Sequence, residues 1–211
     1  MAYCYWICIY STKFKAGGNS MDAFSFEQLL IENPVVGAIR NENDLEKIIT
    51  SKVKIVFILY GSISNVKNIT STLKEAGKVV FVHVDMIDGL KSDQKGIEFI
   101  KEQVDPFGII TTKQNNIKYG HNVGLYTIQR IFVIDSLSLQ TGIKNIHSVS
   151  PNAVEVMPGI ASKIIKSLEK EIHLPIIAGG LINTKKEIME SISSGAMAIS
   201  TTAHELWDLD N

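Results

Sequence analysis

Cysteine and arginine are scarce in this chain of 211 residues. The two cysteines, Cys4 and Cys8, both lie at the start of the chain, so no disulfide can hold the rest together, and this usage fits a reducing compartment. Arg40 and Arg130 are the only arginines, and the formal net charge is −1. Strong bulk attraction to nucleic acid is therefore disfavoured, and any contact with a polyanion must come from lysines on a local face.

Long hydrophobic runs are missing as well. The apolar stretch Ala2–Tyr10 is far shorter than the roughly 20 residues that a membrane-spanning helix needs, and it lacks the basic start and cleavage site of a secretory signal. We interpret residues 1–20 as an N-terminal extension, either a disordered arm or the product of a misassigned start ahead of Met21, with a small membrane or partner anchor as the alternative. Residues 21–211 are then one domain, expected in the cytoplasm and without a membrane partner.

From Met21 onward, short apolar runs rich in β-branched residues alternate with amphipathic stretches of helical length, a pattern typical of parallel strands buried on both faces. The predicted strands are Val35–Ile39, Val53–Tyr60, Lys78–Val84, Gly108–Thr112, Ile131–Asp135, Ala153–Met157, Pro175–Ala178 and Ala196–Thr201. The predicted helices are Phe24–Asn33, which would close the bottom of a barrel, Asp44–Thr50, Ile63–Ala76, Gln94–Gln103, Asn115–Gln129, Leu137–His147, Ile160–Glu171, Thr184–Ser194 and a short His204–Leu209.

An open doubly wound sheet produces similar alternation and is the competing fold. Eight strands favour closure. The loop after the first predicted strand, Arg40–Asn43, also lacks the Gly-x-Gly-x-x-Gly of a dinucleotide-binding sheet. We therefore predict an α/β fold of the TIM type, a parallel eight-stranded (β/α)8 barrel.

The loops after the seventh and eighth predicted strands look like a phosphate-binding corner. In such barrels, ligands bind at the carboxyl ends of the strands. Gly179, Gly180 and Leu181 let the backbone approach an anion closely. Thr201 and Thr202 offer hydroxyl and amide groups at the start of a short helix. Ordinary turns and caps are the alternative for either loop alone, but together the loops predict a bound phosphate.

Charged and polar residues are also predicted to point into the barrel. Period-two alternation turns His83 and Asp85 inward and places Glu155 inward between two outward valines. His83 fits a hydrogen-bonded core histidine, whereas Asp85 lies nearer the mouth, where it can contact a ligand. A buried Glu155 needs a partner. Lys113 is the best candidate, with a ligand hydroxyl or a purely structural pair as alternatives.

The usual signatures of catalysis are missing from the sequence. It contains no His-x-Glu-x-x-His spacing, no Gly-x-Ser-x-Gly turn, no cysteine nucleophile in the predicted barrel and no adjacent carboxylates at a strand end. We therefore expect no catalytic residue, no metal and no cofactor.

Six segments along the predicted barrel form a specific series: Asn33–Arg40, Val82–Leu90, Gly108–Lys113, Gln129–Ser136, Val154–Gly159 and Ala178–Ile182. In this order they resemble the glycerol uptake operon antiterminator family, and the likeness runs from about Phe24 to Trp207. The resemblance implies a cytoplasmic bacterial regulator that senses glycerol 3-phosphate and lets transcription of glycerol-use genes pass a terminator by acting on leader RNA.

Two classes of function remain, and the non-enzymatic regulator is favoured. The alternative is a barrel enzyme acting on a phosphorylated glycerol substrate, such as a phosphodiesterase or a synthase, which would need catalytic groups that the sequence does not show. We expect glycerol 3-phosphate to bind with its phosphate on the five loop residues above and its hydroxyls near Asp85, Lys113 and Glu155.

Leader RNA is the expected macromolecular partner. Because the net charge is near zero, RNA recognition must be confined to a patch of lysines, which a homodimer could assemble. Lys163, Lys166 and Lys170 share one helix face by their spacing, but an ordinary solvated face has the same pattern.

Overall fold

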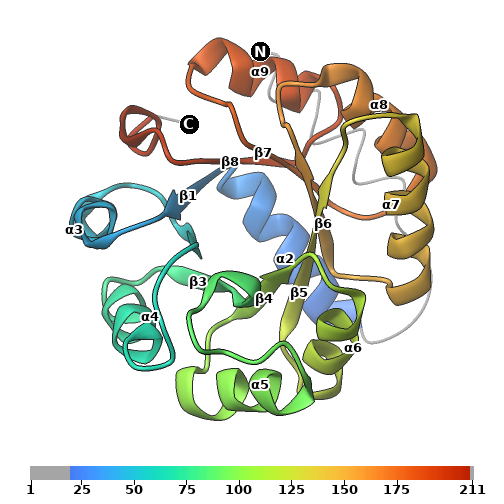
Figure 1. The fold of residues 1–211 in the computed structure, drawn as a ribbon. Helices are drawn as coiled ribbons and strands as arrows, with labels where there is room; N and C mark the ends of the chain where they lie inside the picture. The colour runs from blue at the N-terminus through green and yellow to red at the C-terminus, as the bar shows by residue number, and fades with distance from the viewer. Residues whose placement is uncertain (1–19, 210–211) are drawn as a thin grey trace.

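Eight parallel strands pair in chain order and close into a barrel through hydrogen bonds between β1 and β8 (Figure 1). The structure is a computed structural model that describes residues 20–209. The strands are β1 (Val35–Ile39), β2 (Ile55–Ile58), β3 (Val79–His83), β4 (Gly108–Thr111), β5 (Tyr126–Phe132), β6 (Ala153–Met157), β7 (Ile176–Gly179) and β8 (Ala198–Thr201). The predicted (β/α)8 barrel is confirmed, and the pairing of β1 with β8 excludes the open sheet.

Helices alternate with the strands and surround the barrel (Figure 1). They are α3 (Glu42–Thr50), α4 (Val66–Glu75), α5 (Gln94–Phe99) with the π-helical continuation η2 (Ile100–Val104), α6 (Gln114–Asn122), α7 (Ser136–Val149), α8 (Ser162–Glu171) and α9 (Lys185–Ser193). Two 3-10 turns, η1 (Val84–Met86) and η3 (His204–Leu206), follow β3 and β8. The last predicted helix is therefore a single short turn.

Helix α2 (Ser20–Glu32) precedes the barrel and closes its amino-terminal end, as predicted, although it begins before Phe24. Phe26 packs against Phe81 and Tyr126, with ring centroids 5.6 and 5.2 Å away. Tyr126 is the first residue of β5, so these rings fill the end of the barrel at which the strands begin. A ligand must therefore approach from the carboxyl ends of the strands.

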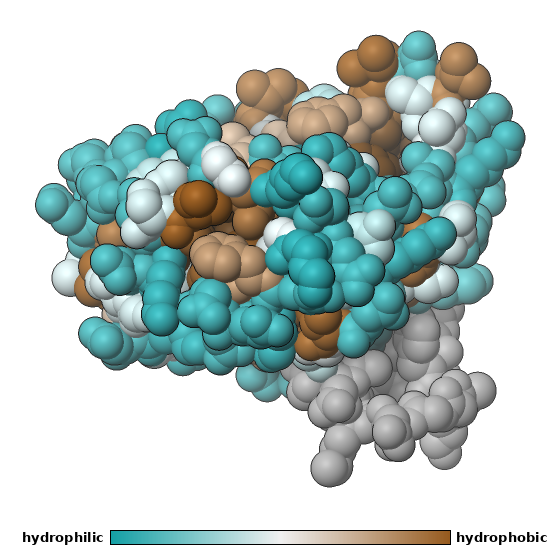
Figure 2. Space-filling model, turned by 60° about the horizontal axis from the view of Figure 1, so that its bottom comes forward, coloured by the Kyte–Doolittle hydropathy of each residue, from teal (hydrophilic) through white to brown (hydrophobic). Residues whose placement is uncertain are grey.

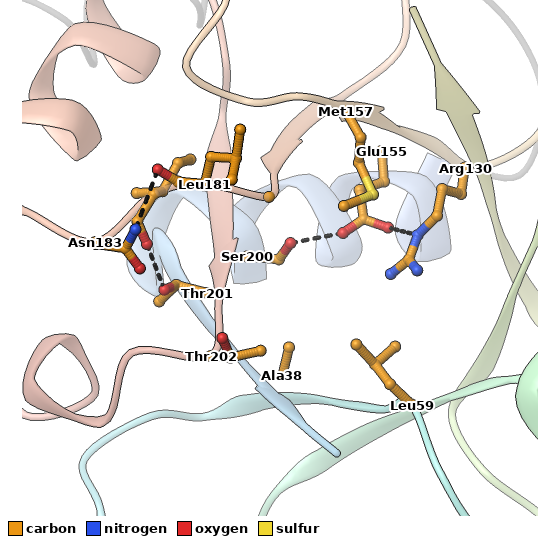
Figure 3. A pocket seen from close by; sticks show the side chains of 12 residues that line it. Ala38, Leu59, Arg130, Glu155, Met157, Leu181, Asn183, Ser200, Thr201 and Thr202 are labelled. Carbon is orange, nitrogen blue, oxygen red and sulfur yellow. Dashed lines mark hydrogen bonds and ion pairs between the residues drawn. The ribbon is translucent and has the colours of Figure 1, made fainter.

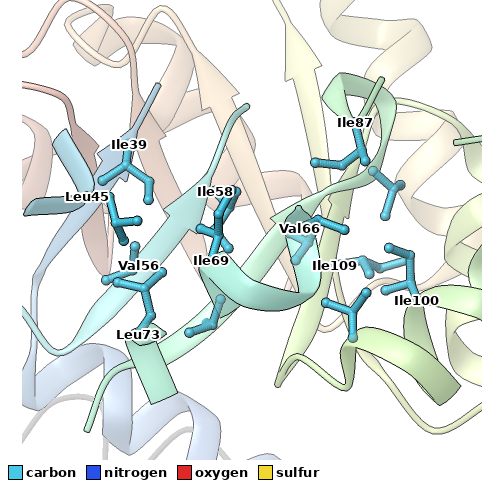
Figure 4. Close-up of a cluster of buried hydrophobic side chains, with 14 of the residues drawn as sticks. Ile39, Leu45, Val56, Ile58, Val66, Ile69, Leu73, Ile87, Ile100 and Ile109 are labelled. Carbon is cyan, nitrogen blue, oxygen red and sulfur yellow. The ribbon is translucent and has the colours of Figure 1, made fainter. Parts of the chain in front are cut away.

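Alternation along the strands divides the core into two layers. Inside the barrel, Phe57, Phe81 and Ile110 form one cluster with residues of α2. Outside it, strand residues pack against the helices in two further clusters, one with Val56 and Val82 and one with Val154 and Val156. Part of the first is drawn in Figure 4. The strands are buried on both faces, which explains why they are continuous apolar runs in the sequence.

The prediction was wrong between α6 and β5. The predicted helix Asn115–Gln129 is too long, and the predicted strand Ile131–Asp135 starts too late, because β5 already begins at Tyr126. Gly124, with φ of +72°, follows the end of α6. A left-handed φ suits glycine and ends a helix, and the segment after it is rich in residues that favour strands.

The ends of α9 and α4 carry residues that favour helix termini. Thr184 caps α9 in a reciprocal arrangement, in which its side chain accepts from the Glu187 N–H and the Glu187 carboxylate accepts from the Thr184 N–H. Gly77 and Gly195, with φ of +73° and +109°, follow the ends of α4 and α9. The cap at Thr184 fixes the start of α9 and so the length of the loop that leaves β7.

The surface shown in Figure 2 is mainly hydrophilic, with hydrophobic side chains in separate groups. One exposed apolar set runs from the end of β5 to the start of α7, where Phe132, Ile134 and Leu137 are 56%, 87% and 72% exposed. No helix within the described part of the chain is long and apolar enough to cross a membrane. The predicted extension of residues 1–20 lies outside the described residues except for Ser20, which belongs to α2, so the division into residues 1–20 and 21–211 stays a prediction.

Candidate ligand-binding site

A small pocket lies at the carboxyl ends of the strands (Figure 3). Its volume is about 90 Å³, against roughly 300–1,000 Å³ for sites that take drug-sized ligands. Its lining consists of Ala38, Leu59, Arg130, Glu155, Met157, Gly180, Leu181, Ile182, Asn183, Ser200, Thr201 and Thr202. The pocket thus has the position of a barrel ligand site and the size for a small molecule.

A buried ion pair lines this pocket. The Nε of Arg130 donates to Oε2 of Glu155 at 2.6 Å, and the Ser200 hydroxyl donates to Oε1 at 2.6 Å. The side chains of Arg130 and Glu155 are 7% and 1% exposed. The Nη groups of Arg130 have no hydrogen-bond partner among the described residues and point away from Glu155 into the pocket (Figure 3). These free donors face whatever the pocket binds.

Strand register brings the ion pair together. Arg130 of β5 lies directly opposite Glu155 of β6. Glu155 points inward as predicted, but Lys113 as its partner was wrong. Ile109, Thr111 and Lys113 alternate along one face of β4 and its continuation. Ile109 belongs to the outer cluster, so this face turns away from the barrel interior.

The loop after β7 exposes backbone donors to the pocket. Gly180 and Leu181 have φ of +77° and +63°, and their N–H groups have no partner among the described residues. Unpaired N–H groups in such turns attract anions. Gly179, just before them, is tightly enclosed, because a Cβ there would lie 2.6 Å from Oε1 of Glu155 and 2.7 Å from the Ser200 hydroxyl. The loop and the ion pair are therefore parts of one packed unit.

The two threonines after β8 differ in their hydrogen bonds. The Thr201 hydroxyl donates to the carbonyl of Ile182 at 2.7 Å and accepts from the N–H of Ala203 at 3.0 Å, so it is already satisfied. Thr202 is half-buried and lines the pocket. All the predicted phosphate residues thus line the pocket except Gly179, which packs against the ion pair.

Asp85 and Lys113 lie outside the pocket lining. The Asp85 carboxylate accepts from the Thr111 hydroxyl at 3.0 Å and from the N–H and hydroxyl of Thr112 at 2.7 and 2.9 Å. The Lys113 ammonium lies 3.9 Å from Asp85, and its side chain is 55% exposed. The structure therefore brings these two residues together beside β4, separately from Glu155.

His83 follows the inward Phe81 by two residues along β3, so it also points into the barrel, and it is 3% exposed. Its Nδ1 has no hydrogen-bond partner in the described structure. Burial, and after it the positive charge of Arg130, lowers the pKa of His83 to about 4. The imidazole is therefore neutral near pH 7.

We expect His83 to make the protein less stable in mild acid. Between about pH 6.5 and pH 4 the unfolded chain binds a proton that the folded protein does not, so stability falls as the pH falls through this window. The loss reaches about 3 kcal/mol. Chemical denaturation at pH 7 and pH 4.5 measures it, and His83→Gln should remove it, whereas the exposed His147→Gln should not. Identical pH profiles for wild type and His83→Gln would refute the assignment.

The fold and pocket together define a parallel (β/α)8 barrel with a small-ligand site at the carboxyl ends of its strands. The family model described as glycerol-3-phosphate responsive antiterminator matches residues 35–207. The chain belongs to this family, which confirms the resemblance found in the sequence.

Related proteins cover most of the chain. A glycerol uptake operon antiterminator regulatory protein from Listeria monocytogenes superposes with a TM-score of 0.80 at 34% identity, over 82% of this chain and 94% of that one. An antiterminator-related protein from Thermotoga maritima has a TM-score of 0.74 at 31% identity, over 83% and 98%. The uncharacterised Escherichia coli protein YgcP is 34% identical over 181 residues, 86% of this chain and 95% of its own. Barrel aldolases at 11% identity or less share the fold alone.

The predicted site residues do not include Arg130, Ser200 and Asn183, which line the pocket. Arg130 had a usable signal. Gly124 ends the preceding helix, and in the strand that begins at Tyr126, Ile128 and Arg130 alternate with outward residues. Ser200 of β8 directly precedes the predicted Thr201, so the sequence indicated its loop but not its side chain. Asn183 is an ordinary loop residue without such a signal. No group of three or more His, Cys, Asp or Glu side chains within residues 20–209 is arranged to hold a metal ion.

Proposed function

We propose that this protein senses glycerol 3-phosphate in the pocket and, in the bound state, lets transcription pass a terminator by acting on leader RNA. The observation that carries the proposal is the pocket itself. It combines unpaired N–H groups at Gly180 and Leu181 with the free guanidinium donors of Arg130 in a space that suits a small molecule. The names of the Listeria and Thermotoga relatives support the regulatory output.

In this proposal the phosphate lies on the loops after β7 and β8. Gly180, Leu181 and Thr202 provide N–H and hydroxyl donors, while Gly179 and Thr201 shape the loops, since the Thr201 hydroxyl is already engaged. The glycerol hydroxyls face Glu155 and Arg130. Asp85 and Lys113 have no part in binding the ligand, because they are not among the residues that line the pocket and the Asp85 carboxylate is held by neighbouring residues.

We propose a regulator and not an enzyme. Glu155, the one carboxylate that lines the pocket, is bound on both oxygens, so it is held as a fixed acceptor. His83 is not among the residues that line the pocket. Neither is presented to a ligand in the manner of a general acid or base.

We propose that the protein acts on RNA in the cytoplasm. The RNA would contact lysines that two copies of the chain bring together in a homodimer. The net charge of −1 provides no general attraction to RNA, so a local patch must supply it. The exposed Phe132, Ile134 and Leu137 form an apolar set whose burial between two copies would favour association.

Calorimetry with purified protein tests the ligand. We expect glycerol 3-phosphate to bind at one site per chain and glycerol, which lacks the phosphate, to bind far more weakly. No detectable heat with glycerol 3-phosphate or related small phosphates would overturn the proposal. Tight binding of an unrelated ligand would assign the pocket to another function.

A further inference from the structure

The pocket has no net charge. Among the residues that line it only Arg130 and Glu155 are ionisable, and they are paired at 2.6 Å. The remaining polar side chains, those of Asn183, Ser200, Thr201 and Thr202, are uncharged. A bound phosphate is then held by N–H groups and hydroxyls, and the rest of the ligand meets a neutral ion pair that still has free Nη donors.

We propose that the Arg130–Glu155 pair makes the site selective for phosphate esters with neutral hydroxyl groups, and that Glu155 rejects esters that carry a carboxylate. This inference rests on the proposed function, because it assumes a phosphate in the same pocket. A hydroxyl can accept from an Nη of Arg130 and donate to an oxygen of Glu155. A carboxylate can only accept, so it would lie beside Glu155 with no proton between the two groups.

The position of Glu155 makes the rejection strong. Its side chain is 1% exposed, so water screens its charge poorly. Arg130 and Ser200 hold its two oxygens, and Gly179 packs closely behind it. The carboxylate therefore cannot turn away from a second negative charge, as an exposed one could.

Titration of the full chain with glycerol 3-phosphate and with 3-phosphoglycerate tests this selectivity. In the second ligand a carboxylate replaces the neutral hydroxymethyl group. We expect glycerol 3-phosphate to bind at least about tenfold more tightly. Equal affinities would overturn the selectivity and leave the phosphate site standing. Absence of binding by both ligands would overturn the proposed function, and this inference with it.

Glu155→Gln keeps the side chain's shape and removes its charge. We expect the preference for glycerol 3-phosphate to fall by about tenfold or more, mainly because 3-phosphoglycerate binds more tightly. Asp85→Asn is the matched control, since it makes the same change outside the pocket, and it should leave the preference within about threefold of wild type. An unchanged preference in Glu155→Gln would contradict the proposal.

Circular dichroism establishes whether Glu155→Gln folds, since it leaves Arg130 without its partner. If it does not fold, the double variant Arg130→Gln/Glu155→Gln removes both charges together. The preference should again fall by about tenfold, because the repelling carboxylate is gone. A preference that persists in the double variant would assign the selectivity to another part of the pocket.

Discussion

Gly180→Asp is expected to weaken glycerol 3-phosphate binding by at least about 100-fold, because it places a carboxylate where the phosphate should lie, at close range and with little screening. Gly180 lines the pocket, and a Cβ there would meet only the end of the flexible Met157 side chain, 2.7 Å away. The new side chain can therefore be accommodated by a shift of Met157. Calorimetry measures the affinity.

Backbone strain is the competing explanation, since Gly180 has φ of +77°. Gly124→Asp is the matched control. Gly124 has φ of +72° with open space around its Cβ position, and it lies in the connection that leads into the start of β5, far from the carboxyl ends. Gly180→Ala adds strain without charge. Similar losses of affinity in Gly180→Ala and Gly180→Asp would show that charge is not responsible.

Arg130→Met is expected to reduce the free energy of unfolding by about 3–5 kcal/mol, because it leaves a buried carboxylate without its cation. Glu155 would then have only the Ser200 hydroxyl as a partner. Urea denaturation measures the loss.

The double variant Arg130→Met/Glu155→Gln removes the uncompensated charge and should recover most of the lost stability. A loss below about 1 kcal/mol in Arg130→Met, the size typical of an exposed ion pair, would mean that solvent reaches Glu155 far more than its burial indicates.

The barrel could be predicted from the sequence because its strands are buried on both faces and therefore appear as separate apolar runs. The β1 and β6 bounds were predicted as the structure has them. The β5 bounds were not, because Tyr126–Gln129 resembles the end of an amphipathic helix unless the break at Gly124 is recognised. A single glycine is tolerated in helices often enough that it does not by itself indicate where a helix ends.

Because of the same error, Arg130 was not predicted as the partner of Glu155. With the strand placed at Ile131–Asp135, Arg130 falls in a loop at the wrong end of the barrel, and Lys113 becomes the remaining cation for Glu155. Arg130 meets Glu155 through the register between neighbouring strands. This register depends on tertiary packing and cannot be deduced from the hydrophobic pattern of the sequence alone. The glycine loop was predictable because its residues are consecutive in the sequence.

The affinity of leader RNA for the protein, measured with and without glycerol 3-phosphate, tests the central claim most directly. A ligand shifts an equilibrium only if it binds the RNA-competent state more tightly than the other. We expect RNA to bind the wild-type protein more tightly when glycerol 3-phosphate is present, and Gly180→Asp to lose this dependence. An RNA affinity that the ligand leaves unchanged in the wild-type protein would refute the proposed regulation and leave a small-ligand barrel without this output.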